Sequence, residues 1–108
     1  MERYEAIREQ VLPILLPFGV EEVALFGSVA RGEETAESDL DILVQFADPP
    51  RRPLSLITWG RLEHELEERC GRKVDLVSAP GLSRHLRPIV EADKVILYAE
   101  RVLQKGAV

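Results

Sequence analysis

The segment from residue 27 to residue 41 constrains the fold of this chain most, because it ends one strand and begins another. Residues 22–26 before it, apolar from Val23 onward, read as a short strand. Gly27-Ser28 breaks that strand, and we expect Ser28 to N-cap a short helical segment. A polar, acidic loop follows, and residues 39–46 form the clearest strand of the sequence. Two strands joined by a helical turn and a loop are therefore predicted here.

The strand at 39–46 has two chemically different faces, because side chains alternate along a strand. Leu40, Ile42, Val44 and Phe46 share one face, and Asp39, Asp41, Leu43 and Gln45 share the other. The first face needs apolar cover, which a packed helix supplies. The second face carries two carboxylates side by side.

Helices and strands alternate along the rest of the chain. Helices are predicted at 3–17, 55–70, 82–92 and over the last ten residues, and further strands at 73–77 and 95–98. Pro13 is expected to end or bend the first helix, and Pro88 to interrupt the third. The order predicts an α/β protein of the α+β type, with helices packed on a small mixed sheet in a single domain spanning residues 1–108.

The charge balance excludes some classes of function. The 14 Lys and Arg residues face 19 Asp and Glu residues, a net charge of −5, which argues against direct nucleic-acid binding. No apolar run is long enough to span a membrane, and no signal peptide is expected at the start. A single cysteine, Cys70, permits no internal disulfide. We therefore expect a cytoplasmic protein.

Three aspartates are the candidate metal ligands. Asp39 and Asp41 repel each other on one strand face, which a divalent cation between them would relieve. Asp75 lies in the middle of a short apolar strand, where a buried charge would need a partner or a metal. If the two strands are neighbours, the three carboxylates converge in a two-metal arrangement suited to Mg²⁺ or Mn²⁺. The alternatives are an exposed strand start and an ion pair of Asp75 with Arg31 or Arg72.

Gly27, Ser28 and Arg31 are the candidate phosphate-binding residues. Gly27 lets the backbone approach an anion, and the N–H groups around Ser28 lie at the start of a helix. The Ser28 hydroxyl can donate to a phosphate, and Arg31 can neutralise phosphate charge. An ordinary strand-to-helix turn remains open, as does an Arg31 that anchors the loop through Asp39 or Glu37.

These residues together form a specific pattern: G-S-x-A-R-G from residue 27, followed by S-D-x-D from residue 38. The pattern resembles the DNA polymerase β-like nucleotidyltransferase superfamily, and its fuller form resembles the minimal nucleotidyltransferase (MNT) branch. Asp75 falls where this family has its third carboxylate. The resemblance covers residues 20–77 and implies the polymerase β-like nucleotidyltransferase fold.

The resemblance also implies an activity. Family members transfer a nucleoside monophosphate from an NTP to an acceptor hydroxyl and release pyrophosphate, with Mg²⁺. Many minimal members are encoded beside a HEPN-domain protein and act as its antitoxin, and some attach AMP to a tyrosine of that partner. Carried over, Asp39 and Asp41 would bind both metals, and Asp75 would bind the catalytic metal and help to deprotonate the acceptor. Gly27 and Ser28 would hold the β- and γ-phosphates of ATP.

Two other functions compete with protein adenylylation. A non-catalytic antitoxin would neutralise its partner by forming a complex with it, and the acidic charge suits a basic partner surface. A small-molecule hydroxyl could also be the acceptor. The expected partners are an NTP and a HEPN-domain protein, and both homo- and hetero-oligomers remain open.

Overall fold

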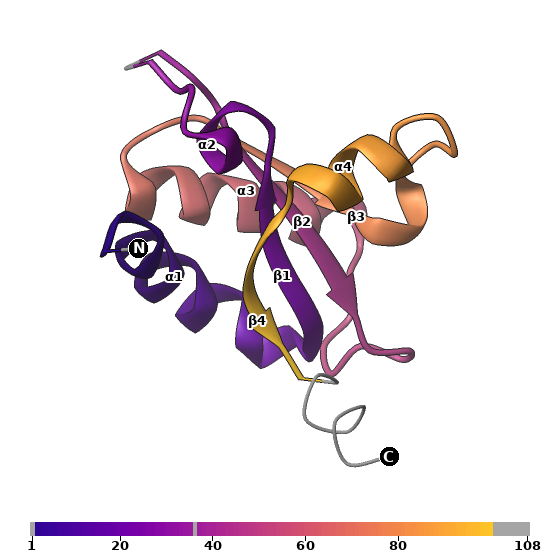
Figure 1. Cartoon of the computed structure of the whole chain (residues 1–108). Coiled ribbons are helices and arrows are strands. Elements are labelled where there is room, and N and C mark those ends of the chain that lie inside the picture. Colours follow the sequence, from indigo (N-terminus) through magenta and orange to yellow (C-terminus); the bar gives the residue numbers. More distant parts are fainter. Residues whose placement is uncertain (1, 36, 101–108) are drawn as a thin grey trace.

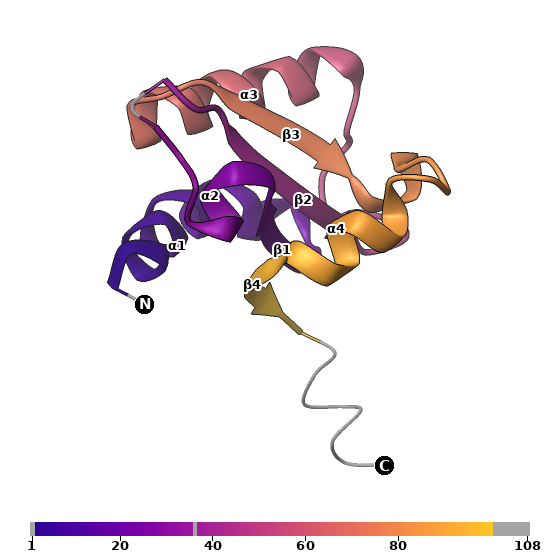
Figure 2. The ribbon, with the colours of Figure 1, turned by 45° about the horizontal axis from the view of Figure 1, so that its top comes forward.

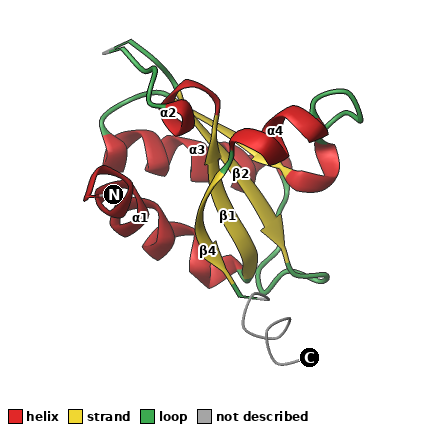
Figure 3. Cartoon of the chain, in the orientation of Figure 1, coloured by secondary structure: helices red, strands yellow, loops and turns green. Residues whose placement is uncertain are grey.

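The computed structural model describes residues 2–35 and 37–100. The helices are α1 (Glu2–Leu15), α2 (Gly27–Arg31), α3 (Leu56–Cys70) and α4 (Arg87–Asp93), and the strands are β1 (Val20–Phe26), β2 (Leu40–Phe46), β3 (Val74–Ser78) and β4 (Val95–Ala99). Two 3₁₀ turns, η1 (Leu16–Phe18) and η2 (Ala79–Gly81), follow α1 and β3 (Figures 1 and 3). The predicted helix at the C-terminus lies outside the described residues from residue 101 onward.

The four strands form one mixed sheet in the order β3-β2-β1-β4. β1 pairs antiparallel with both β2 and β4, whereas β2 and β3 run parallel. Parallel neighbours need a crossover connection, and α3 provides it. The predicted mixed sheet is confirmed, and the strands predicted to carry the aspartates are neighbours in it.

The main core lies between the sheet and the pair α1 and α3. Leu40, Ile42 and Val44 of β2 are fully buried there, together with Leu66 of α3. The prediction that this face of β2 is covered by a helix is confirmed. Burying each such side chain contributes about 1.5–3 kcal/mol relative to exposure. This layer therefore supplies most of the hydrophobic stabilisation of the fold.

The opposite face of the sheet is covered by α4, as Figure 2 shows. Its buried cluster among the described residues consists of Ala24, Leu43 and Val90. α4 has only seven residues, so it covers part of the face. The carboxylate-bearing ends of β2 and β3 lie on the part that α4 leaves open.

The helix α3 follows its sequence signals closely. The Ser55 Oγ accepts a hydrogen bond from the Thr58 N–H at 3.1 Å, which caps the N-terminus. Leu62 and Leu66 of this helix are buried. Gly71 ends the helix with a φ of 70°, a left-handed conformation that glycine adopts readily.

Three local predictions were wrong. Pro13 does not end α1, which continues to Leu15; its ring is exposed, and the one backbone hydrogen bond that it removes lies near the helix end. Ser28 does not cap α2: Phe26 occupies the N-cap position with extended backbone, so Ser28 is already in the first turn. Pro88 lies in the first turn of α4, a place that suits proline.

In the part of the chain that the structure describes, no helix is long and apolar enough to cross a membrane.

Candidate active site

The parallel pairing of β2 and β3 brings two of the predicted carboxylates together. Asp41 lies opposite Asp75 in the register of the two strands, so the two side chains point to the same face. Asp39 precedes Asp41 by two positions and ends the loop that leads into β2. The condition set for a shared carboxylate site, that these two strands are neighbours, is met.

The electrostatics of Asp41 reflect this crowding. Partial burial, together with the negative charges of Asp75 and Asp39, raises the pKa of Asp41 above its usual range. The nearby Arg31 acts in the opposite direction and lowers that pKa. The site therefore concentrates negative charge that a bound cation would relieve.

The expectation from the sequence that Asp75 carries a buried charge was wrong. Asp75 is exposed rather than buried, because α4 does not extend over this part of β3. It is not held by the arginines considered for it either: the ion pairs of Arg31 are with Glu33 and Asp93, and that of Arg72 is with Glu34. The Asp75 side chain is therefore accessible to a substrate.

Gly27 joins the phosphate-binding candidates to the carboxylates. It has a φ of +75°, which most residues avoid. A Cβ at this position would overlap the Asp41 carboxylate oxygen Oδ2. Glycine is thus required here twice, for the backbone conformation and for the close approach of Asp41.

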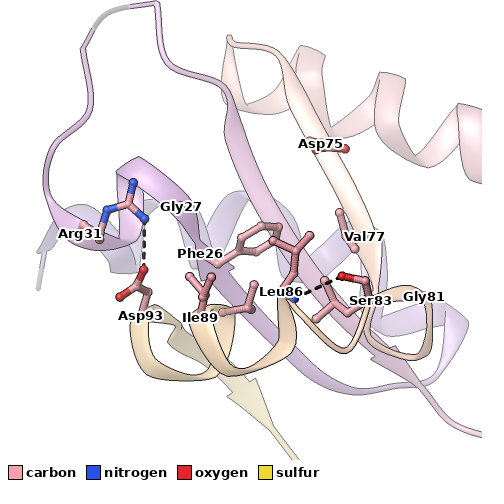
Figure 4. A pocket seen from close by; sticks show the side chains of 12 residues that line it. Phe26, Gly27, Arg31, Asp75, Val77, Gly81, Ser83, Leu86, Ile89 and Asp93 are labelled. Carbon is pink, nitrogen blue, oxygen red and sulfur yellow. Dashed lines mark hydrogen bonds and ion pairs between the residues drawn. The ribbon is translucent and has the colours of Figure 1, made fainter.

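Arg31 has partners other than those predicted. Its Nε donates to Glu33 Oε1 at 2.9 Å, and its Nη1 donates to Asp93 Oδ2 at 3.1 Å. Asp93 ends α4, so this ion pair links α2 to the helix that covers the second face of the sheet (Figure 4). The alternative in which Arg31 anchors the loop through Asp39 or Glu37 is not observed among the described residues; within this loop the guanidinium bonds to Glu33 instead.

A pocket of about 410 Å³ lies beside the carboxylates. Gly27, Arg31 and Asp75 line it on the side of the predicted site, and residues of η2 and α4 complete it (Figure 4). Its volume falls in the usual range for small-molecule sites, about 300–1,000 Å³. The sequence analysis missed the contribution of Ile89 and Asp93 of α4 and of Leu86 at its N-cap position. The only signal for Leu86 and Ile89 was their apolar character in a segment rich in charge.

The chemistry of the donor set suits a hard divalent cation. Carboxylate oxygens are the ligands that Mg²⁺ and Mn²⁺ prefer. Within residues 2–35 and 37–100, no three potential metal-ligating side chains already surround one point. Mg²⁺ commonly uses one or two carboxylates and completes its shell with water and substrate phosphates. The pair Asp41 and Asp75, which lie opposite each other, fits that mode of binding, in which the nucleotide supplies the remaining ligands.

Similar proteins match most of this chain. The sequence profile described as "Nucleotidyltransferase domain" matches residues 6–101, which include every predicted site residue. A candidate protein adenylyltransferase of Methanocaldococcus jannaschii is 43% identical over 72 residues, covering 67% of this chain and 73% of the relative.

Two solved structures have the same fold. One, described as a candidate minimal nucleotidyltransferase, is 40% identical with a TM-score of 0.71, covering 87% of this chain and 92% of that chain. Another, a toxin–antitoxin with AMP-PNP, is 26% identical with a TM-score of 0.73, covering 85% of this chain and 73% of that chain. The fold predicted from the sequence is therefore confirmed.

Proposed function

The chain belongs to the nucleotidyltransferase domain family, and we propose that it transfers AMP from ATP to a tyrosine hydroxyl of a HEPN-domain toxin, for which it is the antitoxin. The observation that carries the proposal is the placement of Asp41 opposite Asp75, with the Gly27 backbone against the Asp41 carboxylate. This places a backbone that can approach phosphate beside carboxylates that can hold a metal.

The three aspartates would hold Mg²⁺, or Mn²⁺, in this proposal. When bound, the cation neutralises the charge of the phosphates and polarises them. Gly27 and Ser28 would receive the β- and γ-phosphates, since a residue with no Cβ lets the chain approach closely. Arg31 would add positive charge near the same phosphates while Glu33 and Asp93 fix its guanidinium.

Asp75 would act on the acceptor. Its carboxylate is exposed beside Asp41 and accessible to a hydroxyl from a partner protein. As the hydroxyl oxygen attacks the α-phosphorus, Asp75 would accept the hydroxyl proton, and the bond between the α-phosphorus and the bridging oxygen breaks to release pyrophosphate. The products are an AMP ester on the acceptor and pyrophosphate.

The choice of a protein acceptor is supported by the names of similar proteins and by the sequence motifs. The relative from Methanocaldococcus jannaschii is named for protein adenylylation, and one structural neighbour is a toxin–antitoxin with AMP-PNP. The HEPN-domain partner and its tyrosine come from the resemblance of the G-S-x-A-R-G and S-D-x-D motifs to MNT proteins.

Intact-mass spectrometry of the co-encoded partner tests the proposal. The partner is incubated with ATP, Mg²⁺ and either the unchanged chain, the double variant Asp39→Asn/Asp41→Asn, or the control Asp48→Asn. Asp48 is an exposed carboxylate after β2, away from the site. We expect the unchanged chain and the control to add the mass of AMP, and the double variant to add none.

Two other results of the mass measurement would contradict the proposal in different ways. A mass gain that persists in the double variant contradicts the assignment of the carboxylates. A stable complex in which no protein gains mass with any NTP would instead identify a non-catalytic antitoxin.

A further inference from the structure

The pocket beside the carboxylates extends under α4, away from the residues assigned to phosphate and metal. Gly27 and Asp75 belong to both regions, so the pocket is continuous with the proposed transfer site. Figure 4 shows Arg31 and Asp93 at one end of the pocket and Val77, Gly81 and Ser83 at the other. A ligand held at Gly27 can therefore extend directly into it.

Two large apolar side chains form the outer wall of this pocket. Leu86 is 52% exposed and Ile89 is 58% exposed, although both are large hydrophobic residues. They are three residues apart at the start of α4, so they lie on neighbouring positions of one helix face. Exposed apolar side chains beside a concave surface are typical of ligand sites.

Apart from Asp75 at the transfer site, the charged and hydroxyl side chains that line the pocket have partners. Arg31 and Asp93 bond to each other at 3.1 Å, and the Ser83 Oγ accepts a hydrogen bond from the Leu86 N–H at 3.2 Å. The inner wall adds the aromatic ring of Phe26 and the side chain of Val77. The pocket therefore offers apolar contact on both walls, which suits a flat ring system rather than a charged group.

We propose that this pocket holds the nucleoside part of the substrate, with the base packed against Leu86 and Ile89. The inference rests on the proposed function, because the phosphates at Gly27 fix where the nucleoside begins. A volume of about 410 Å³ accommodates a base and a ribose. The faces of a base are apolar enough to pack on such walls, in the way that bases stack on side chains elsewhere.

Equilibrium binding to two ligands tests this assignment. One is a non-hydrolysable ATP analogue and the other is inorganic tripolyphosphate, each with Mg²⁺. The double variant Leu86→Ser/Ile89→Ser should bind the ATP analogue about tenfold more weakly, since it loses apolar contact with the base. It should bind tripolyphosphate with unchanged affinity, because tripolyphosphate has no base.

A matched control uses exposed apolar residues elsewhere. Leu56 and Ile57 are 92% and 72% exposed at the start of α3. The variant Leu56→Ser/Ile57→Ser should bind both ligands with unchanged affinity. Thermal unfolding confirms that both double variants are folded, which their exposure leads us to expect.

The outcomes separate this inference from the proposed function. If the unchanged protein binds neither ligand, both the proposed function and the inference are overturned. If it binds both, and the Leu86/Ile89 variant binds the ATP analogue as tightly, the base site is overturned while the proposed function stands. A variant that keeps its nucleotide affinity but has a higher KM for the partner protein would assign the pocket to the acceptor and also overturn the inference.

Discussion

Replacing Gly27 by alanine tests how the chain brings its backbone against the Asp41 carboxylate. The change imposes two separate costs. Alanine must adopt the φ of +75° that Gly27 has, and its Cβ would overlap Asp41 Oδ2. Gly32 separates the two costs, because it has a φ of +74° but a Cβ added there would meet no atom within 4 Å.

The two costs have different sizes. A left-handed backbone costs alanine about 1–2 kcal/mol. The Asp41 carboxylate is the end of a side chain and can rotate away, at a cost of about 0.5–1.5 kcal/mol for a strained rotamer. We therefore expect Gly27→Ala to lower the free energy of unfolding by about 2–3 kcal/mol and Gly32→Ala by about 1–2 kcal/mol.

Urea unfolding of the metal-free protein measures these values. Gly60→Ala is the control, since Gly60 lies within α3, has no left-handed φ and has open space around it. Alanine there should raise the free energy of unfolding by about 0.5–1 kcal/mol, because glycine is unfavourable inside a helix.

A double-mutant cycle isolates the contact itself. In an Asp41→Ala background the oxygen that meets the new Cβ is gone, so Gly27→Ala should cost about 1 kcal/mol less than in the unchanged protein. If Gly27→Ala and Gly32→Ala cost the same and the cycle shows no coupling, the close approach of Gly27 to Asp41 is refuted.

Two further predictions concern Asp41 in the sheet and Glu67 of α3, which bonds to the sheet. Asp41→Asn should raise the free energy of unfolding by about 0.5 kcal/mol at pH 7 without metal, because it relieves a partly buried charge opposite Asp75. Since the folded-state pKa of Asp41 is raised, the ionised form destabilises the fold, and the gain should close as the pH falls toward the ordinary value of 3.8; a gain that grows on acidification would contradict this. Glu67→Ala should lower the free energy of unfolding by about 1 kcal/mol, because Glu67 Oε2 accepts the N–H of Val74 on the edge strand β3 at 3.2 Å. The exposed Glu65→Ala should change it by less than about 0.5 kcal/mol, and equal effects of the two would contradict the role of Glu67.

The sequence predicts the carboxylate pair well because the signals are local. The period-two pattern of β2 defines which side chains share a face, and the short apolar strand around Asp75 has a single acidic position. Whether the two strands pair was left as a condition of the prediction; the helix between them, with its cap at Ser55 and its end at Gly71, provides the crossover of the parallel pair.

The features that could not be predicted depend on packing between distant parts of the chain. The Arg31–Asp93 pair joins residues 62 positions apart and exists only because α4 lies over one end of the sheet. The same placement leaves Asp75 exposed, whereas the sequence alone suggested a buried charge. Neither outcome is encoded in residues near Arg31 or Asp75.

Transfer of label from ATP to the partner protein tests the central claim most directly. The reaction is run with ATP labelled at the α-phosphate or at the γ-phosphate, and with the unchanged chain or Asp75→Asn. Our account predicts that only the α-label becomes bound to the partner, and that Asp75→Asn abolishes this transfer. Retention of the γ-label, or undiminished transfer by Asp75→Asn, would contradict nucleotidyl transfer at these carboxylates.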